Sequence, residues 1–497
     1  MAGRDEVAAV GAEPAGRTAR ETGAVFLKCL IVLFLLSLPL VNPWVRGDGV
    51  GYYAYVHSLL IDHDLHFENE WQAGNPSFRQ ARVDEQGQVR ADQFSPTGYV
   101  KNHFSVGPSI LWFPFLAAVH GAVLAVDAMG AHVAADGYSR PYLVAMALAT
   151  AAYGFVGLLL SFDLARRYFA ERWAFLATLG IWLTSSLPVY MYFNPSWSHA
   201  HSAFAVALFL WYWHRTRGRR TLSQWFVLAL MAGLMMNVYY PNAILLLVPG
   251  IETLTEFGRA LQQKSRKQDV LTSLSKPAFF LLVTGISLLP TFITRRIIYG
   301  SWFESDYPAM RSWFWASPKL LPVLFSTDHG MLIWTPILIP SIVGLVLLCR
   351  CDKLFGISLV LSFLGYYYFI ASYPDWDGLS SFGNRFFVPL TILFILGLSA
   401  MLDFLGGLWR QQGRAFAAAS CLLGLLVLWN AGLIFQWGTQ MIPARGEIPW
   451  REVVHNQFAE VPFRVTGGLE GYFERRKSMM QEIEKQDLTR QLRTPAQ

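Results

Sequence analysis

The sequence predicts an all-α integral membrane protein with about eleven transmembrane helices and a large first extracytoplasmic loop carrying interfacial helices. The chain of 497 residues is 54% hydrophobic and only 15% charged, whereas soluble proteins are about a quarter charged. Long apolar runs alternate with short basic segments, which is typical of a chain that crosses a bilayer repeatedly. Aromatic residues gather at the ends of these runs, where a membrane meets water.

Eleven apolar runs are interpreted as spans. The first, Val25–Leu40, is not followed by a small-residue cleavage site, so we interpret it as an uncleaved span and not as a signal peptide. The others, in chain order, are Tyr142–Ser161, Trp173–Tyr192, Ala203–Trp213, Trp225–Val238, Ala243–Leu254, Ala278–Ile293, Met331–Leu348, Leu354–Ser372, Phe386–Leu405 and Ala415–Trp437.

The placement of basic residues predicts which loops are cytoplasmic. Basic loops usually stay on the cytoplasmic side of a membrane. Here those loops are Arg166-Arg167, Arg215–Arg220, Arg259–Lys267, Arg350 with Lys353, and Arg410 with Arg414. They share one side only if the apolar stretch 110–126 does not cross. Pro114 and His120 interrupt this stretch, so we interpret it as an interfacial helix.

This topology divides the chain into three parts. Residues 1–24 form a cytoplasmic N-terminal tail, and residues 25–437 form the transmembrane domain with its first extracytoplasmic loop at 44–139. Residues 438–497 form an extracytoplasmic C-terminal tail, helical in part over Leu469–Leu492. The expected location is a bacterial inner (plasma) membrane, with the functional site on the extracytoplasmic side.

Several classes of function are not expected. The basic residues follow the membrane topology, so nucleic acid is not an expected partner. No glycine-rich phosphate loop is present in the sequence, so a sugar nucleotide or ATP is not an expected direct substrate. The four cysteines lie within or beside apolar runs, and we expect no disulfide framework.

Asp48 is the first candidate for chemistry. It directly follows the first span, within Gly47-Asp48-Gly49, and an apolar helix is expected from Gly51 to Asp62. A carboxylate at the start of a helix is stabilised by the helix dipole. Position alone leaves two interpretations open, namely a helix cap and a catalytic acid or base.

More acids follow in the same loop. Asp62, Asp64, Glu68 and Glu70 are interleaved with two histidines, His63 and His66. Such residues can bind a metal, but a solvated polar turn explains them equally simply, and we favour the turn. No metal site is therefore predicted, although a divalent metal stays an open alternative.

Basic residues on the predicted outer side run against the topology rule and point to a bound anion. Lys101 lies in Lys101-Asn102-His103, just before the interfacial helix, and Arg385 lies at the outer end of a late span. A lipid phosphate would suit both. Arg295 and Arg296 directly follow a span, and we interpret them as reaching toward phospholipid headgroups.

Taken together, these motifs resemble a known family. They are the glycine-rich acidic motif 47–53, the segment 101–108 before the interfacial helix, the Leu164–Phe169 end of a span, and the Trp376–Phe387 segment. The chain is similar to the polytopic glycosyltransferases of the GT-C type that use lipid-phosphate sugars, and above all to bacterial family-39-like members. That group includes protein O-mannosyltransferases and lipid A aminoarabinose transferases.

The resemblance implies a function. The donor would be a polyprenyl-phosphate sugar, and a lipid, glycan or protein hydroxyl would be the acceptor in an inverting transfer at the outer membrane face. Asp48 would be the catalytic base. Lys101 and Arg385 would stabilise the phosphate, and the other candidate substrate-binding residues are Tyr52, His103, Asp62 and Asp64.

One departure and one alternative remain. Many members of the family carry an acid directly after the catalytic aspartate, where this chain has Gly49. Asp48 is thus left alone, with Asp62 and Asp64 as candidates for a second acid. No cofactor is expected. The alternative function is a polytopic transporter or lipid flippase, which would be expected to carry charged residues within its spans.

Overall fold

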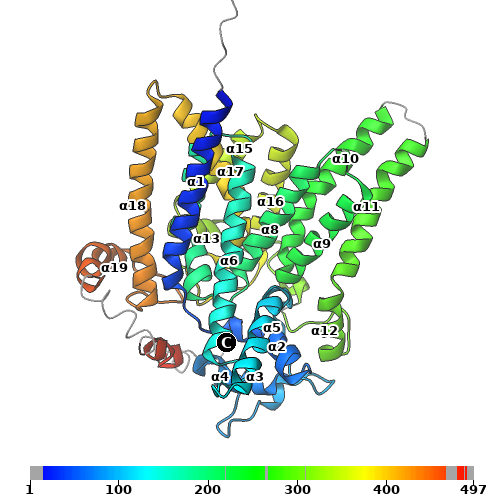
Figure 1. The fold of residues 1–497 in the computed structure, drawn as a ribbon, viewed down its shortest axis with the longest axis vertical. Coiled ribbons are helices and arrows are strands. Elements are labelled where there is room, and N and C mark those ends of the chain that lie inside the picture. The colour runs from blue at the N-terminus through cyan, green and yellow to red at the C-terminus, as the bar shows by residue number, and fades with distance from the viewer. Residues whose placement is uncertain are drawn as a thin grey trace, which may run out of the picture.

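The computed structural model describes residues 15–218, 220–262, 267–307, 309–465, 478, 480–485 and 487–489. Over these residues the chain is helical, and the strand-like pairings are two isolated bridges, Val83 with Val89 and Phe94 with Val100. The all-α prediction is therefore confirmed. Long helices stand side by side in a bundle, and short helices gather at its lower end (Figure 1).

Twelve of the described helices make up the bundle and its flanks. They are α1 (Ala15–Ser37), α6 (Arg140–Ala165), α7 (Glu171–Thr184), α8 (His199–Thr216), α9 (Leu222–Val238), α10 (Leu247–Gln262), α11 (Lys267–Ser287), α12 (Leu289–Tyr299), α15 (Leu338–Leu348), α16 (Lys353–Ser372), α17 (Thr391–Gly407) and α18 (Gln412–Gly438).

Shorter helices and turns connect these elements. The helices are α2 (Asp48–His57), α3 (Glu68–Ala73), α4 (Pro76–Gln80), α5 (Gly107–Ala128), α13 (Leu320–Phe325), α14 (Met331–Trp334) and α19 (Trp450–His455). The π turns are η2 (Ser58–Asp62), η4 (Val189–Phe193) and η8 (Asn456–Glu460). The 3-10 turns are η1 (Leu38–Leu40), η3 (Ala91–Gln93), η5 (Tyr240–Leu246), η6 (Met310–Ser312) and η7 (Arg385–Leu390).

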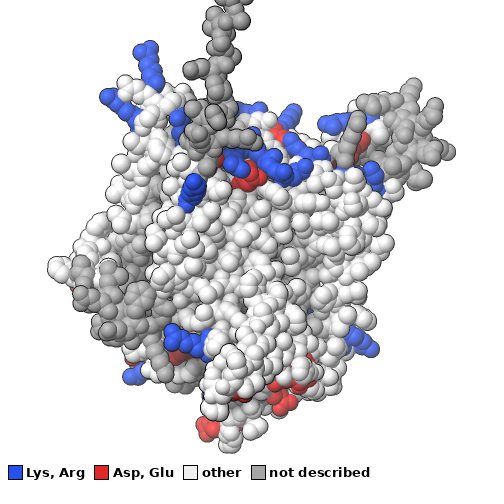
Figure 2. Space-filling view, viewed as in Figure 1, with Lys and Arg blue, Asp and Glu red and all other residues white. Residues whose placement is uncertain are grey.

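The described helices are those of a membrane protein. Five of them are long and apolar enough to cross a bilayer, or six if the bent pair at α11–α12 is one span. Three shorter apolar helices accompany them. Figure 2 shows a broad band with few charged side chains around the middle of the visible face, as a lipid-facing belt requires. The prediction of an integral membrane protein is confirmed, whereas the number eleven is not.

Several predicted spans are broken where the sequence places proline. The predicted run Trp173–Tyr192 was expected to be continuous, but α7 ends at Thr184 and η4 begins after Pro188. The predicted run Met331–Leu348 is likewise split at Pro336 between α14 and α15. Proline lacks the N–H that an unbroken helix needs and collides with the preceding turn. Apolar character alone therefore overestimated the continuity of these helices.

The predicted cytoplasmic loops lie on one face of the bundle. Asp163, near the end of α6, pairs with Arg166 at 2.6 Å and Arg167 at 3.2 Å, and lies 3.9 Å from Arg215 at the end of α8. Arg217 pairs with Asp352 before α16, and Arg220 pairs with Glu252 of α10 at 2.6 Å. Lysine and arginine side chains accordingly crowd the upper rim in Figure 2.

Some predicted segments fall partly or wholly outside the described residues. They are residues 1–14 of the N-terminal tail, Arg219, residues 263–266 of the basic loop Arg259–Lys267, and much of the predicted tail helix Leu469–Leu492. The described part of the tail is helical at 480–485 and 487–489.

Helix α5 covers the predicted interfacial stretch 110–126. By length and composition α5 could cross a membrane, but the chain contacts α2 both at the start of α5 and after its end. At its start Ser109 donates to the Tyr52 carbonyl at 2.6 Å, and nine positions after its last residue the Gly137 carbonyl accepts from Tyr53 at 2.5 Å. The start of α5 and the segment after it therefore lie on one face of the bundle, and this arrangement favours the interfacial interpretation.

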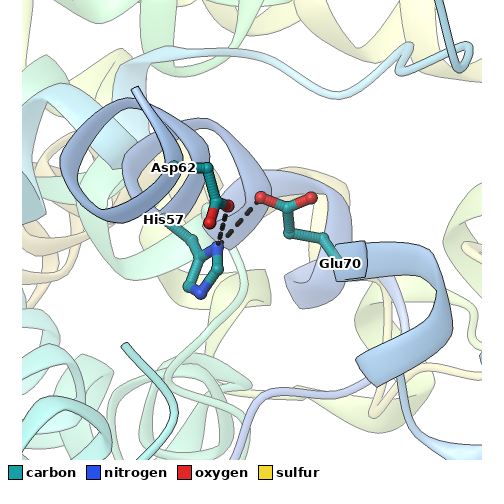
Figure 3. A group of neighbouring side chains, drawn as sticks. All are labelled: His57, Asp62 and Glu70. Atoms are coloured by element: carbon teal, nitrogen blue, oxygen red, sulfur yellow. Dashed lines mark hydrogen bonds and ion pairs between the residues drawn. The ribbon is translucent and has the colours of Figure 1, made fainter. Parts of the chain in front are cut away.

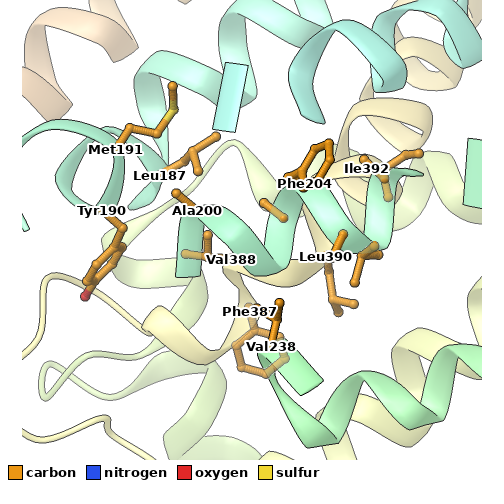
Figure 4. Close-up of a cluster of buried hydrophobic side chains, with 14 of the residues drawn as sticks. Leu187, Tyr190, Met191, Ala200, Phe204, Val238, Phe387, Val388, Leu390 and Ile392 are labelled. Atoms are coloured by element: carbon orange, nitrogen blue, oxygen red, sulfur yellow. The ribbon is translucent and has the colours of Figure 1, made fainter. Parts of the chain in front are cut away.

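A buried apolar cluster lies where α8 meets η7 (Figure 4). Ala200 and Phe204 of α8 lie beside Val388 and Leu390 of η7 and Ile392 at the start of α17. All residues of η7 are buried, including Arg385. Burial of these side chains, worth about 1.5–3 kcal/mol each for the larger ones, fixes the backbone that carries Arg385.

We predict that the basic face is cytoplasmic and that the face of α2 is extracytoplasmic. The test uses a variant whose own cysteines are replaced. In it, Gln86→Cys in the first loop should react with a membrane-impermeant maleimide added to intact cells, and Gln411→Cys should react only after the membrane is opened. Both glutamines are exposed. Labelling of Gln411→Cys in intact cells would reverse the topology.

Candidate active site

Asp48 begins α2. Gly47 precedes it in a left-handed conformation (φ 52°) that side chains other than glycine rarely adopt, so the backbone can turn sharply from the first span into the helix. The carboxylate of Asp48 does not cap the helix, because its hydrogen bond comes from the side chain of Arg385. Of the two interpretations left open above, the geometry favours a functional carboxylate over a cap.

The pair of Asp48 and Arg385 is the centre of the candidate site. Arg385 Nη1 donates to Asp48 Oδ2 at 2.6 Å, a short charge-assisted bond. The Arg385 side chain is only 9% exposed, and its guanidinium lies over the ring of Trp197 at 4.4 Å. The Asp48 side chain is 32% exposed. Arg385 therefore holds one carboxylate oxygen, and the exposed part of the carboxylate can meet a substrate.

The chain on either side of Asp48 is held by loops from elsewhere. Trp197 Nε1 donates to the Arg46 carbonyl at 3.0 Å, and the Gly47 N–H donates to Asn75 Oδ1 at 2.8 Å. A Cβ atom at Gly49 would stand 2.0 Å from the hydroxyl oxygen of Ser196. A side chain at residue 49 would therefore require Ser196 to move, which explains why glycine suits this position.

The described part of the C-terminal tail reaches this loop. Arg46 Nη2 pairs with Asp487 at 2.5 Å, and Arg46 Nε lies 3.4 Å from Glu484. Asn75 also donates to Glu484 at 2.8 Å. The tail therefore lies on the same face as Asp48, and its carboxylates hold Arg46 and Asn75, which flank the aspartate in space.

A cavity begins one helical turn along α2 from Asp48, at Tyr52. Its lining includes Tyr52 and His103, both predicted to bind substrate, together with Arg295 of α12, Tyr240 and Tyr307. Arg295 was interpreted from sequence as reaching toward lipid headgroups, and its position in the cavity wall corrects that interpretation. Arg296, its neighbour, is exposed as expected. A helix presents successive residues about 100° apart, which is why only one of the two arginines faces the cavity.

Burial sets the charge state of the predicted cavity residues. Loss of water around the imidazole lowers the pKa of His103 to about 4, although the charge of Asp48 opposes this. Burial, aided by the charge of Asp48, raises the pKa of Tyr52. Both side chains are therefore neutral near pH 7, and they can orient a substrate by hydrogen bonds without adding charge.

Lys101 has partners of its own. Its ammonium donates to the Asp92 carbonyl at 3.0 Å and lies 3.9 Å from Asp306. Arg385 is paired with Asp48 instead. The charges of Asp48 and Asp306 both act to raise the pKa of His103, against the larger effect of burial. Whether Lys101 and Arg385 share one phosphate stays a prediction.

Asp62 and Asp64 are not brought to Asp48. They lie beyond the far end of α2, in and just after η2, roughly 15–20 Å from Asp48 along the helix. Asp62 accepts from Asn69 at 2.9 Å, and Asp64 accepts from Ser58 at 2.7 Å. The expectation that they bind the same substrate as Asp48, or serve as its second acid, is not supported by this arrangement.

Metal-ligand groups are also absent around Asp48 within the described part of the chain. The one group of three suitable side chains found there is His57, Asp62 and Glu70, at the other end of α2 (Figure 3). The sequence predicted no metal site, and it did not single out His57.

Several site residues were missed from sequence. Trp197 and Ser196 belong to a polar break, Asn194–Ser198, between two apolar runs, and such a break on the predicted outer side was a usable signal. Asn75 and Glu484 carried no such signal, because an isolated amide or acid in a polar segment has no distinguishing pattern. Asn75 acts through its contact with Gly47, 28 positions away, and Glu484 through its contact with Asn75, 409 positions away.

The fold defines a class, that of polytopic helical membrane proteins, and the site adds a cavity on the face opposite the basic loops. Residues 142–265 match the family described as Dolichyl-phosphate-mannose-protein mannosyltransferase. The match confirms the predicted resemblance to family-39-like GT-C glycosyltransferases and with it the prediction of a membrane glycosyltransferase. It favours the enzyme over the alternative of a transporter or flippase.

Two solved structures are similar to the chain. ArnT from Cupriavidus metallidurans in the apo state is 12% identical, with a TM-score of 0.48, and the match covers 90% of this chain and 76% of that one. ArnT bound to undecaprenyl phosphate is 13% identical, with a TM-score of 0.47, and the match covers 84% of this chain and 72% of that one. None of the curated proteins matches the sequence.

We predict that Asp48 and Arg385 are energetically coupled. In a double-mutant cycle, Asp48→Asn and Arg385→Gln should each lower Tm, and the double variant should lose less than the sum. The coupling should be about 1–3 kcal/mol, because each single change leaves a partly buried charge unpaired. Thermal unfolding of the purified chain followed by tryptophan fluorescence would measure it.

The control cycle uses Asp92→Asn and Arg90→Gln. That pair is 3.3 Å apart but 48% and 59% exposed, so its coupling should stay within about 0–1 kcal/mol. Additive effects of the Asp48 and Arg385 changes would mean that the ion pair does not organise the site.

Proposed function

We propose that the protein transfers a sugar from a polyprenyl-phosphate donor to a hydroxyl group of an acceptor on the extracytoplasmic side of the membrane. The observation that carries the proposal is the partly exposed Asp48 carboxylate, oriented by buried Arg385 and one helical turn from a cavity that Arg295 lines. The family match adds support, because the matched family is described by a lipid-phosphate sugar. The acceptor would be a lipid, glycan or protein hydroxyl.

Arg295 is the best placed cation for the donor phosphate. It lines the cavity, and within the described residues no carboxylate forms an ion pair with it. Its guanidinium charge is therefore available to an anion. The planar guanidinium group can also donate two parallel hydrogen bonds to a phosphate. Lys101, although paired with Asp306 at 3.9 Å, would supply a second cation when phosphate enters. Arg385, which pairs with Asp48 at 2.6 Å, would orient that carboxylate.

The reaction would be a single displacement with inversion. The acceptor oxygen forms a bond to the anomeric carbon while the bond from that carbon to the phosphate oxygen breaks, and the phosphate leaves with the electron pair. Asp48 takes the hydroxyl proton through its oxygen that Arg385 does not hold. Phosphate is a good leaving group and needs charge stabilisation more than a proton, which Arg295 and Lys101 would provide. Tyr52 and His103 would orient the sugar.

The proposed topology has eleven crossings, with residues 1–24 in the cytoplasm and residues 438–497 outside. The first loop, 44–139, and the tail then meet on the extracytoplasmic side, which agrees with the contacts of Arg46 to Glu484 and Asp487. A bacterial plasma membrane is the proposed location, since lipid-linked sugars are presented there from the outer leaflet.

We expect Asp48→Asn to reduce transfer by about 10²–10⁴-fold, because the amide keeps the shape and removes the base. Membranes from a deletion strain carrying each variant would be supplied with radiolabelled polyprenyl-phosphate sugars, and label moved to endogenous acceptors would be counted. Asp84→Asn, an exposed turn aspartate of the same loop, is the control and should transfer at the wild-type rate. Normal turnover by Asp48→Asn would remove it from the mechanism.

The neighbouring arginines of α12 offer a matched comparison. Arg295→Gln should weaken binding of undecaprenyl phosphate by about 10–100-fold, the worth of one charge-assisted contact, whereas Arg296→Gln should change it little. Binding to the purified protein would be measured by the lipid-dependent rise in Tm. Equal effects of the two substitutions would mean that Arg295 contacts bulk lipid and not a donor phosphate.

A further inference from the structure

A second polar centre lies at the far end of the helix that begins with Asp48. His57, the last residue of α2, directs Nδ1 toward two carboxylates, with Asp62 Oδ2 at 3.1 Å and Glu70 Oε1 at 2.9 Å (Figure 3). One ligand atom from each residue lies within 4.8 Å of the others. Three elements, α2, η2 and α3, therefore converge on one point.

The other nitrogen of the imidazole fixes its protonation. His57 Nε2 lies 3.0 Å from the Asp136 carbonyl, which can only accept, so Nε2 carries the hydrogen. In the neutral ring Nδ1 then presents a lone pair to the two carboxylates, and three electron-rich atoms face one another. A cation must stand among them, either a proton on Nδ1 or a metal ion. A carbonyl that accepts from the distal nitrogen is also the usual support for a metal-binding histidine.

Glu70 adds an independent observation. Its side chain is fully buried, and its second oxygen, Oε2, has no hydrogen-bond partner. A buried carboxylate that is half satisfied is costly unless a cation compensates it.

We propose that His57, Asp62 and Glu70 bind a divalent transition-metal ion of the zinc or manganese type. Two carboxylates and a neutral imidazole carry a net charge of −2, which such an ion neutralises. Nitrogen and oxygen ligands together suit Zn²⁺ and Mn²⁺ better than the oxygen-only preference of Ca²⁺ and Mg²⁺. Asp62 is 27% exposed, so it opens the site to water and gives the ion a path of entry.

The distances fit a metal with small adjustment. Ligand atoms around a tetrahedral ion with bonds of about 2.0–2.1 Å stand roughly 3.3 Å apart, and the two measured separations from Nδ1 are 3.1 Å and 2.9 Å. The sequence had pointed to His63 and His66 as the histidines among these acids. The structure instead uses His57, which lies one and a half helical turns before Asp62.

The ion would have a structural role and would take no part in the transfer reaction. Nine residues separate His57 from Asp48, about 13 Å along α2. The ion would tie the end of α2 to α3 and, through the Asp136 carbonyl, to the segment after α5. The helix that carries Asp48 would thereby be fixed at both ends.

The test measures metal binding on the full chain purified in detergent, so it does not depend on transfer activity. After removal of metals with EDTA and addition of ZnCl2 or MnCl2, wild type should bind one ion per chain and show a higher Tm. Mn²⁺-loaded wild type should give a pulsed EPR signal from a single coordinating imidazole nitrogen.

Variants assign the ligands. Glu70→Gln and Asp62→Asn should each weaken binding by more than about 100-fold, beyond what loss of a supporting partner costs. Glu68→Gln, an exposed acid of the same short helix, should bind as wild type does. If Glu70→Gln fails to fold, the partly exposed Asp62 and the wild-type EPR signal still decide the question.

Two results would overturn the proposal. One is a wild-type chain that binds no Zn²⁺ or Mn²⁺ after EDTA treatment, which would leave a protonated His57 between the two carboxylates. The other is a bound ion that shows no imidazole nitrogen or is retained by Asp62→Asn.

Discussion

The ion pair between Asp48 and Arg385 is the interaction on which the arrangement of the site depends. It joins residues 337 positions apart, one just after the first span and one in the last quarter of the chain. A buried guanidinium without a partner costs several kcal/mol, so the first loop and η7 cannot be correctly placed independently of each other. Trp197, stacked on Arg385 and bonded to the Arg46 carbonyl, joins the same unit.

Irregular backbone gathers on the side of the bundle where this pair lies. The breaks at η4, η5 and η7, and the bend before α12, bring Tyr190, Tyr240, Arg385 and Arg295 toward the cavity or the pair. Backbone outside regular helices is tolerated within a membrane protein where other protein covers it or where it lines a cavity. The opposite face keeps long helices that end in exposed ion pairs such as Arg166 with Asp163. The two ends of the bundle thus differ in structure as well as in charge.

Helix α2 connects two sites of different character. At its start a carboxylate is partly exposed and paired with an arginine, which suits chemistry with a substrate. At its end a histidine and two acids surround a single point in a buried setting, which suits a fixed cation. Ser109 of α5 donates to the Tyr52 carbonyl, and this bond holds α2 against α5. A change at either end is therefore transmitted along about 13 Å of rigid helix.

The sequence alone determined the helical membrane class and the shared face of the basic loops, and it singled out Asp48 and Arg385, which the structure brings together. These follow from local signals: apolar runs, charge placement and residue types that are out of place at a membrane surface. The sequence could not predict where α7 and α14 end. The end of a helix near a proline depends on which group replaces the lost backbone hydrogen bond, and that group comes from the tertiary structure.

Only the tertiary structure decided which of these residues contact each other and which of them face the cavity. Arg385 pairs with Asp48, Arg295 and not Arg296 faces the cavity, and His57 and not His63 joins Asp62 and Glu70. Each choice depends on the rotation of a helix or on a contact between distant segments. A sequence pattern records which residue types are present, but a contact is set by the packing of the whole bundle.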